Sequence, residues 1–103
     1  MNRFLVSIVA LFALAGGAPA VAQDGEAFAK DKGCLACHAT DKKIVGPSYK
    51  DVAGRYGKGS VDALAAKILK GSVGVWGLVP MPANTGVKPD EAKKLATWIL
   101  SLQ

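Results

Sequence analysis

The feature that most constrains this chain is the run Cys34-Leu35-Ala36-Cys37-His38, which contains both cysteines and the only histidine of the sequence. The pattern C-x-x-C-H is the attachment signature of c-type haem. Two thiols three positions apart lie on one turn of backbone, so each can add to a vinyl group of the porphyrin, and the next residue lies over the iron. We therefore expect one covalent haem c on Cys34 and Cys37, with His38 as an iron ligand.

Other interpretations of this motif remain open. A dithiol redox pair needs C-x-x-C without the histidine and normally lies in a βαβ setting, which this sequence does not suggest. A structural zinc site needs four protein ligands, and two cysteines with one histidine leave it one short. A chance occurrence is disfavoured in a chain with so few Cys and His.

The start of the chain has the pattern of a secretory signal peptide. Arg3 precedes an uncharged apolar run at 4–15, and Ala20-Val21-Ala22 supplies a small-x-small cleavage site. We expect residues 1–22 to be a cleaved signal peptide and 23–103 to be the mature domain, exported to the periplasm. The alternative is a membrane anchor, because residues 4–22 are uncharged and nearly as long as the roughly 20 residues that a spanning helix needs. The glycines and the proline at 16–19 argue against an anchor.

The mature residues predict one small all-α domain. Asp24 and Ser60 are expected to cap the first and third helices, and the first and last helices are expected to cross, with Phe28 against Leu95 and Trp98. A chain of this size has a thin core, which a bound haem would complete. Periodicity and capping predict four short helices, at 24–32, 48–55, 61–70 and 89–102, with no convincing strand and no second domain.

A second candidate iron ligand lies in the Gly/Pro-rich segment 71–88, which is predicted to be a long loop. Met81 stands between Pro80 and Pro82 and is the only methionine left once the leader is removed. The prolines restrict the backbone before them to extended conformations, so the side chain is presented rigidly. A thioether suits reduced iron, and His/Met ligation raises the haem potential. The alternatives for this position are a lysine amine, Asn84 or an open site.

The identity of the sixth ligand decides the function. With both axial positions filled, the iron has no place for oxygen, peroxide or substrate, and only a one-electron change between Fe(III) and Fe(II) remains. The chain is then an electron carrier and not an enzyme. An open or labile sixth site would instead indicate a haem sensor or a haem enzyme.

The charge balance indicates the kind of partner. The 13 Lys+Arg and 8 Asp+Glu give a formal net charge of +5, which falls to +4 once Arg3 is removed with the leader. Lys30, Lys32, Lys42 and Lys43 lie around the attachment motif and are expected to steer an acidic redox protein. No aromatic–basic pattern favours nucleic-acid binding. The mature chain is not expected to insert stably into a membrane.

Four motifs follow one another along the chain, and the first of them contains C-x-x-C-H. They are the runs at 33–38 (GCLACH), 45–53 (VGPSYKDVA), 74–77 (GVWG) leading to Pro80-Met81-Pro82, and 90–101 (DEAKKLATWILS). Together they resemble the small class I bacterial cytochromes of the cytochrome c-551 type, over nearly all of 24–103. The resemblance implies a monomeric all-α cytochrome c fold in the periplasm. It also implies electron transfer from a donor such as a cytochrome bc complex to a nitrite reductase, terminal oxidase or peroxidase.

The resemblance also implies roles for three residues around the haem. Pro47 would offer its carbonyl to the outer N–H of His38 and so fix the ring. Trp76 would donate its indole N–H to a haem propionate. Asn84 would form a hydrogen bond near the Met81 sulfur and tune the potential.

Two positions depart from the usual pattern. Lys67 lies where some relatives carry an arginine near a propionate. Lys88 stands in place of the usual capping serine of the last helix, although Pro89 offsets part of that loss because proline is favoured at the first helical position.

Overall fold

The computed structural model describes residues 20–102, and the side chains from residue 24 onward. The predicted signal peptide therefore lies almost wholly outside the described residues. Between 20 and 102 the chain forms no β-strand, only isolated bridges, so the prediction of an all-α domain is confirmed. None of the helices in this range is long and apolar enough to cross a membrane. The α-helices are α1 (Ala20–Asp31), α2 (Tyr49–Tyr56), α3 (Val61–Lys70) and α4 (Pro89–Leu100), and two 3₁₀ turns are η1 (Cys34–Ala36) and η2 (Lys58–Ser60).

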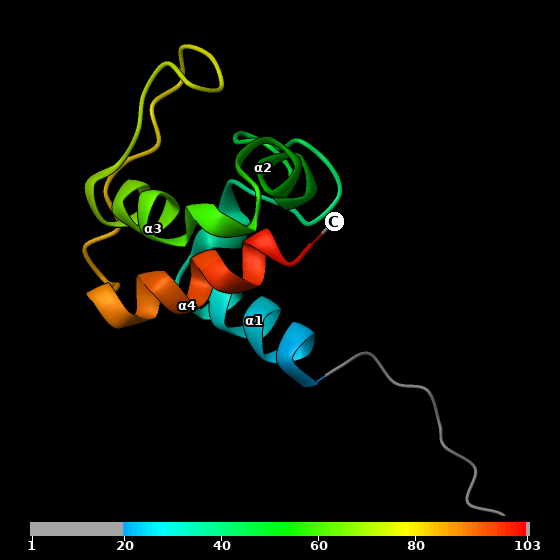
Figure 1. Ribbon diagram of the computed structural model, residues 1–103. Helices are drawn as coiled ribbons and strands as arrows, with labels where there is room; N and C mark the ends of the chain where they lie inside the picture. The colour runs from blue at the N-terminus through cyan, green and yellow to red at the C-terminus, as the bar shows by residue number, and fades with distance from the viewer. Residues whose placement is uncertain (1–19, 103) are drawn as a thin grey trace, which may run out of the picture.

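Helix α4 is the centre of the domain. It packs against α1, α2 and α3, and Figure 1 shows it crossing the middle of the molecule. Its apolar residues recur on the face that meets the other helices, which is why a helix with several charged residues still buries Leu95, Trp98 and Ile99. After α3 the chain leaves the helices in a long loop, residues 71–88, before it returns to α4 (Figure 1).

The crossing of α1 and α4 occurs at a glycine. A Cβ placed on Gly25 would overlap the indole of Trp98, so the helices approach more closely here than a side chain would allow. Phe28, which was predicted to face Leu95 and Trp98, is half-buried against the core cluster that contains both. The crossing of these helices was thus predicted correctly, but Gly25, which permits their closest approach, was not identified from the sequence.

The start of α1 corrects one prediction. The helix begins at Ala20, so Asp24 lies inside it and is not its N-cap. The residues before Asp24 include alanine and glutamine, which favour helix, and they continue the helix toward the N-terminus. The other end agrees with the prediction, because Gly33 adopts a φ of 80° directly after the last turn.

Ser60 corrects a second prediction. It precedes α3, but its backbone is not extended (φ −99°, ψ 22°) and its side chain makes no capping bond. The hydroxyl instead donates to the Tyr56 carbonyl at 2.5 Å, because η2 turns the chain back toward α2. Ser48 does cap its helix and accepts a hydrogen bond from the Asp51 N–H at 3.1 Å.

The last helix begins at Pro89 as expected and ends at Leu100, two residues before the predicted end. Lys88 provides no side-chain cap. The Glu91 carboxylate accepts the Lys88 backbone N–H at 3.0 Å, which satisfies a donor at the start of α4.

Candidate haem-binding site

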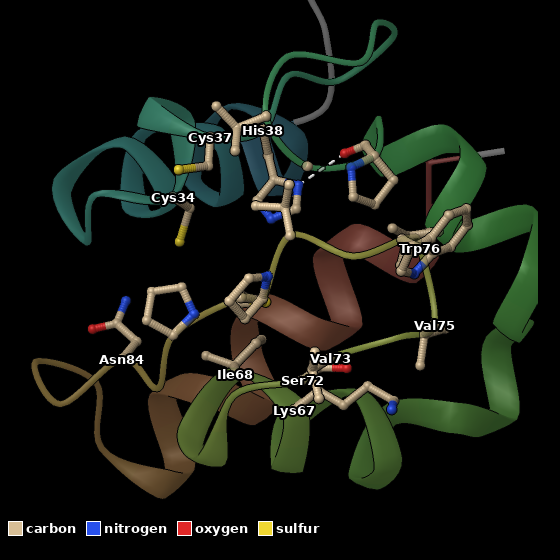
Figure 2. A pocket seen from close by; sticks show the side chains of 18 of the residues that line it. Cys34, Cys37, His38, Lys67, Ile68, Ser72, Val73, Val75, Trp76 and Asn84 are labelled. Carbon is tan, nitrogen blue, oxygen red and sulfur yellow. Dashed lines mark hydrogen bonds between the residues drawn. The ribbon is translucent and has the colours of Figure 1, made fainter.

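A cleft of about 420 Å³ opens between η1, α2, α3 and the loop 71–88 (Figure 2). Most of the residues that line it are apolar, and Lys43 and Lys67 are the charged ones, with no Asp or Glu among them. Such a cleft suits a large apolar ligand that carries negative groups. All seven residues predicted for the haem site line it: Cys34, Cys37, His38, Pro47, Trp76, Met81 and Asn84.

The two cysteines and the histidine lie on one tight turn. The backbone N–H groups of Cys37 and His38 both donate to the Cys34 carbonyl, at 3.3 and 3.0 Å. Figure 2 shows the three side chains together at one end of the cleft. Neither cysteine forms a disulfide, and residues 20–102 bring together no group of three His, Cys, Asp or Glu that could hold a metal ion, as a zinc site would require.

Burial shifts the pKa values of two groups at this turn, the Cys34 thiol and the Tyr49 hydroxyl. Burial raises the pKa of the Cys34 thiol, although the neighbouring Tyr49 hydroxyl acts in the opposite direction. Burial, followed by the charge of Cys34, raises the pKa of the Tyr49 hydroxyl far above its ordinary value. Before the haem is attached, both groups are therefore neutral at physiological pH.

The His38 ring is held by three neighbours. Its Nδ1 lies 2.8 Å from the Pro47 carbonyl oxygen (dashed in Figure 2), and because a carbonyl can only accept, Nδ1 carries the proton. Nε2 is then left as the nitrogen that can bind iron. The Tyr49 ring stacks on the imidazole with centroids 5.0 Å apart. A Cβ at Gly46 would lie 2.5 Å from Cε1 of the ring, so only glycine fits there.

The backbone of Met81 is fixed at the base of its loop. Ser72 and Met81 exchange two backbone hydrogen bonds, of 3.0 and 2.8 Å, and the N–H of Asn84 donates to the Ile68 carbonyl at 2.9 Å. Gly71, at φ 83°, lets the Met81 carbonyl approach so closely that a Cβ would lie 2.7 Å from it. The half-buried Met81 side chain thus enters the cleft that His38 also lines.

Asn84 uses its side chain to tie the loop to the turn that follows α1. Its Nδ2 donates to the Lys32 carbonyl at 3.1 Å, and its Oδ1 accepts the Gly86 N–H at 3.1 Å. These bonds use one amide proton and the oxygen. A second amide proton remains for the predicted contact with the Met81 sulfur, which is not formed within residues 20–102 of this structure.

The fold and this geometry match a known family. A sequence model described as "Cytochrome c" matches residues 22–103. The chain belongs to the cytochrome c family. This cytochrome is 49% identical to the cytochrome c-551 of Stutzerimonas stutzeri and 50% identical to the cytochrome c-552 of Hydrogenobacter thermophilus, in each case over 100% of both chains. The crystal structure of Nitrosomonas europaea cytochrome c552 is similar too, with a TM-score of 0.73, 46% identity and coverage of 76% of this chain and 99% of that one.

The cytochrome is thus of the class I monohaem c-551 type and carries one haem c, attached through Cys34 and Cys37. It is an electron carrier and not an enzyme, like the small cytochromes that it matches. Its own residues fit the cofactor, because the Tyr56 hydroxyl is buried beside the cleft with no hydrogen-bond partner among residues 20–102. An unpaired buried hydroxyl costs about 1–3 kcal/mol, and a haem carboxylate would supply an acceptor at a cleft whose lining has no Asp or Glu.

Sequence reasoning missed several residues that shape this site. Gly46, Tyr49 and Ser72 hold the two candidate ligands; Gly46 and Tyr49 lie in the motif 45–53, but that motif assigned a role only to Pro47. Gly46 offered one local signal, since a glycine directly before the proline that contacts His38 marks a close approach of the backbone. The contacts of Tyr49 with His38 and of Ser72 with Met81 form across loops, where no periodicity predicts which residues meet.

Proposed function

We propose that this cytochrome is a periplasmic one-electron carrier whose haem iron is bound by His38 and Met81. The observation that carries the proposal is that both side chains line one cleft, each on a backbone fixed by hydrogen bonds. The bound haem supplies a one-electron couple between Fe(III) and Fe(II). The protein contributes the two axial ligands, an apolar surround and a rigid frame, and it leaves no coordination position for a substrate.

The neighbouring residues keep each ligand in place. The Pro47 carbonyl holds the N–H of His38, which orients the ring and makes it a stronger ligand. Asn84 would direct its remaining amide proton to the Met81 sulfur. Trp76 and Lys67, which Figure 2 shows on the side of the cleft away from the cysteines, would donate to a haem carboxylate.

Export through the leader 1–22, with cleavage before Gln23, is part of the proposal. The family match begins at residue 22, and the solved Nitrosomonas europaea chain corresponds to only 76% of this chain while 99% of its own length is covered. Both observations support a mature domain that starts near residue 23. They are consistent with the periplasm, the compartment in which the predicted signal peptide would deliver the domain.

The surface charge supports a role for electrostatics in choosing redox partners. Lys30, Lys42 and Lys43 are exposed near the attachment turn, whereas Lys32 forms an ion pair with Glu91 at 3.4 Å and is less available. We expect this monomer to meet acidic surfaces on a donor such as a cytochrome bc complex and on an acceptor such as a nitrite reductase, terminal oxidase or peroxidase. Electron-transfer rates with such partners should fall as ionic strength rises.

The absorption spectrum tests the ligand pair. The ferric protein should show the weak long-wavelength charge-transfer band of methionine bound to haem iron, and the reduced protein should not bind carbon monoxide at neutral pH. Met81→Ala should lose the band, bind carbon monoxide and have a lower potential. Leu78→Ala is the matched control, because Leu78 is in the same loop and 95% exposed. A wild-type protein that lacks the band, or that binds carbon monoxide, would favour a haem sensor and overturn the proposal.

A further inference from the structure

Four side chains on the side of the cleft away from the cysteines form a stack in which cations flank two rings. The Arg55 guanidinium carbon lies 4.8 Å from the centre of the Trp76 ring, and the Trp76 and Tyr56 rings are 6.4 Å apart and tilted by 59°. The Lys67 ammonium lies 5.9 Å from the centre of the Tyr56 ring. We call these four residues the Arg55 ladder. The ladder joins α2 and α3 to the loop that carries Met81.

The Arg55 ladder holds residues 73–80, which the backbone hydrogen bonds between Ser72 and Met81 leave free of the helices. The backbone pair of Ser72 and Met81 closes the base of the loop, but residues 73–80 extend beyond it. Leu78 and Val79 in this segment are 95% and 67% exposed, whereas Trp76 is 37% exposed because it lies against α2. Arg55 Nη1 also donates to the carbonyl of the residue before the tryptophan, Val75, at 3.3 Å.

Arginine suits this place better than lysine does. A planar guanidinium can stack on an indole and still donate an N–H in its own plane, while an ammonium is a point charge that cannot do both. Arg55 is the only arginine of residues 23–103, where eleven lysines supply the other basic side chains. A lysine could supply positive charge equally well, so the need for an arginine at position 55 is explained by its two contacts, with the Trp76 ring and with the Val75 carbonyl.

We infer that Arg55 is a positioning residue, which fixes the Trp76 indole at the end of the haem cleft and holds residues 73–80 against α2. By doing so it opposes opening of the loop and loss of Met81 from the iron. The inference rests on the proposed function for the link to Met81, but the placement of Trp76 can be tested separately.

Two measurements on the haem-loaded protein test the role of Arg55. The first is hydrogen exchange of the Trp76 indole N–H, followed by NMR in the reduced protein. The second is the rate at which imidazole replaces the native sixth ligand in the ferric protein, which depends on how often the loop opens. The variants are Arg55→Lys and Arg55→Met, with Lys50→Met as the matched control. Lys50 is an exposed cation on the same helix for which residues 20–102 show no side-chain bond.

We expect both Arg55 variants to increase the exchange rate and the imidazole rate about fivefold, which corresponds to about 1 kcal/mol, the scale of one exposed cation–π contact. Lys50→Met should change neither by more than about twofold. Full rescue by Arg55→Lys would overturn the inference, since lysine keeps the charge and the aliphatic stem. Equal effects of Lys50→Met and Arg55→Met would also overturn it, because charge alone would then explain them.

The two proposals can fail independently. If wild-type protein lacks the methionine charge-transfer band, Met81 ligation is wrong, but the exchange of the Trp76 N–H still decides whether Arg55 positions the indole. If the band is present and the Arg55 variants exchange as slowly as wild type, the role of Arg55 is wrong and the ligand pair stands.

Discussion

Replacing Gly46 with alanine is expected to destabilise the haem-loaded protein by displacing the His38 ring. The added Cβ would lie 2.5 Å from Cε1 and 2.9 Å from Nδ1 of that ring, well inside the separation of about 3.5–4 Å at which carbon atoms attract. The ring cannot retreat freely, because Nδ1 is 2.8 Å from the Pro47 carbonyl and Tyr49 stacks 5.0 Å away. Overpacking of this kind costs about 1–3 kcal/mol of unfolding free energy.

Gly54→Ala provides the matched control for this experiment. Gly54 lies in α2 and has no heavy atom within 4 Å of its ideal Cβ position. An alanine inside a helix is about 0.5–1 kcal/mol more stable than a glycine. The two substitutions add the same methyl group, yet they should shift the midpoint of thermal unfolding in opposite directions, by about 4–8 °C per kcal/mol for a domain of this size.

Circular dichroism during heating measures both midpoints, and the ferric absorption spectrum reports on the displaced imidazole. The reasoning is refuted if Gly46→Ala unfolds at the wild-type temperature with an unchanged spectrum while Gly54→Ala is stabilised. The His38 ring would then have room to turn, and the close packing of Gly46 would have no consequence for the ligand.

Three further substitutions test other contacts. Gly25→Ala should lower the thermal midpoint by overpacking the Trp98 indole, at a cost of about 1–3 kcal/mol; an unchanged midpoint would mean that the helices separate freely. Gly33→Ala should lower the free energy of unfolding in denaturant by about 1 kcal/mol, because the φ of 80° at Gly33 disfavours a side chain. Gly33→Asn should lower it less, because asparagine tolerates this conformation better. Equal losses in the two variants would argue against the backbone explanation. The pKa of Glu91 is lowered chiefly by the hydrogen bond from the Lys88 N–H, so the carboxylate stabilises the fold above the ordinary carboxyl pKa and loses this effect as the pH falls through the lowered value. Glu91→Gln should therefore have a lower free energy of unfolding than wild type near neutral pH, and this difference should disappear in acid. Denaturant titrations at several pH values measure the difference, and a difference that stays constant with pH would contradict the prediction.

Most of the fold could be predicted because its signals are local. The apolar residues of α3 and α4 recur at helical spacing, and Gly33 and Pro89 mark an end and a start. The errors at Asp24 and Ser60 have a common origin. A capping residue is recognised by its type, but whether it caps depends on the backbone before it, which continues as helix in one case and turns through η2 in the other.

The candidate site also has a part that could be predicted from local sequence and a part that could not. Cys34, Cys37 and His38 form a motif that can be read without a structure. The contacts that hold the loop 71–88 around the cleft cannot be found this way, because Arg55 reaches Val75 across 20 positions and Asn84 reaches Lys32 across 52. Such contacts depend on how the helices pack, and no periodicity in one segment encodes the position of another.

The backbone pair between Ser72 and Met81 separates Met81 from the most exposed residues of its loop. Residue 81 is fixed from the helical side of the pair, by α3 and by the bond from Asn84 to Ile68. The exposed tip, with Leu78 and Val79, lies on the other side. Substitutions of Leu78 or Val79, which are not part of the Arg55 ladder, can therefore alter what the molecule recognises while Met81 keeps its place in the cleft, so descendants of this chain could acquire new partners without first rebuilding their redox centre.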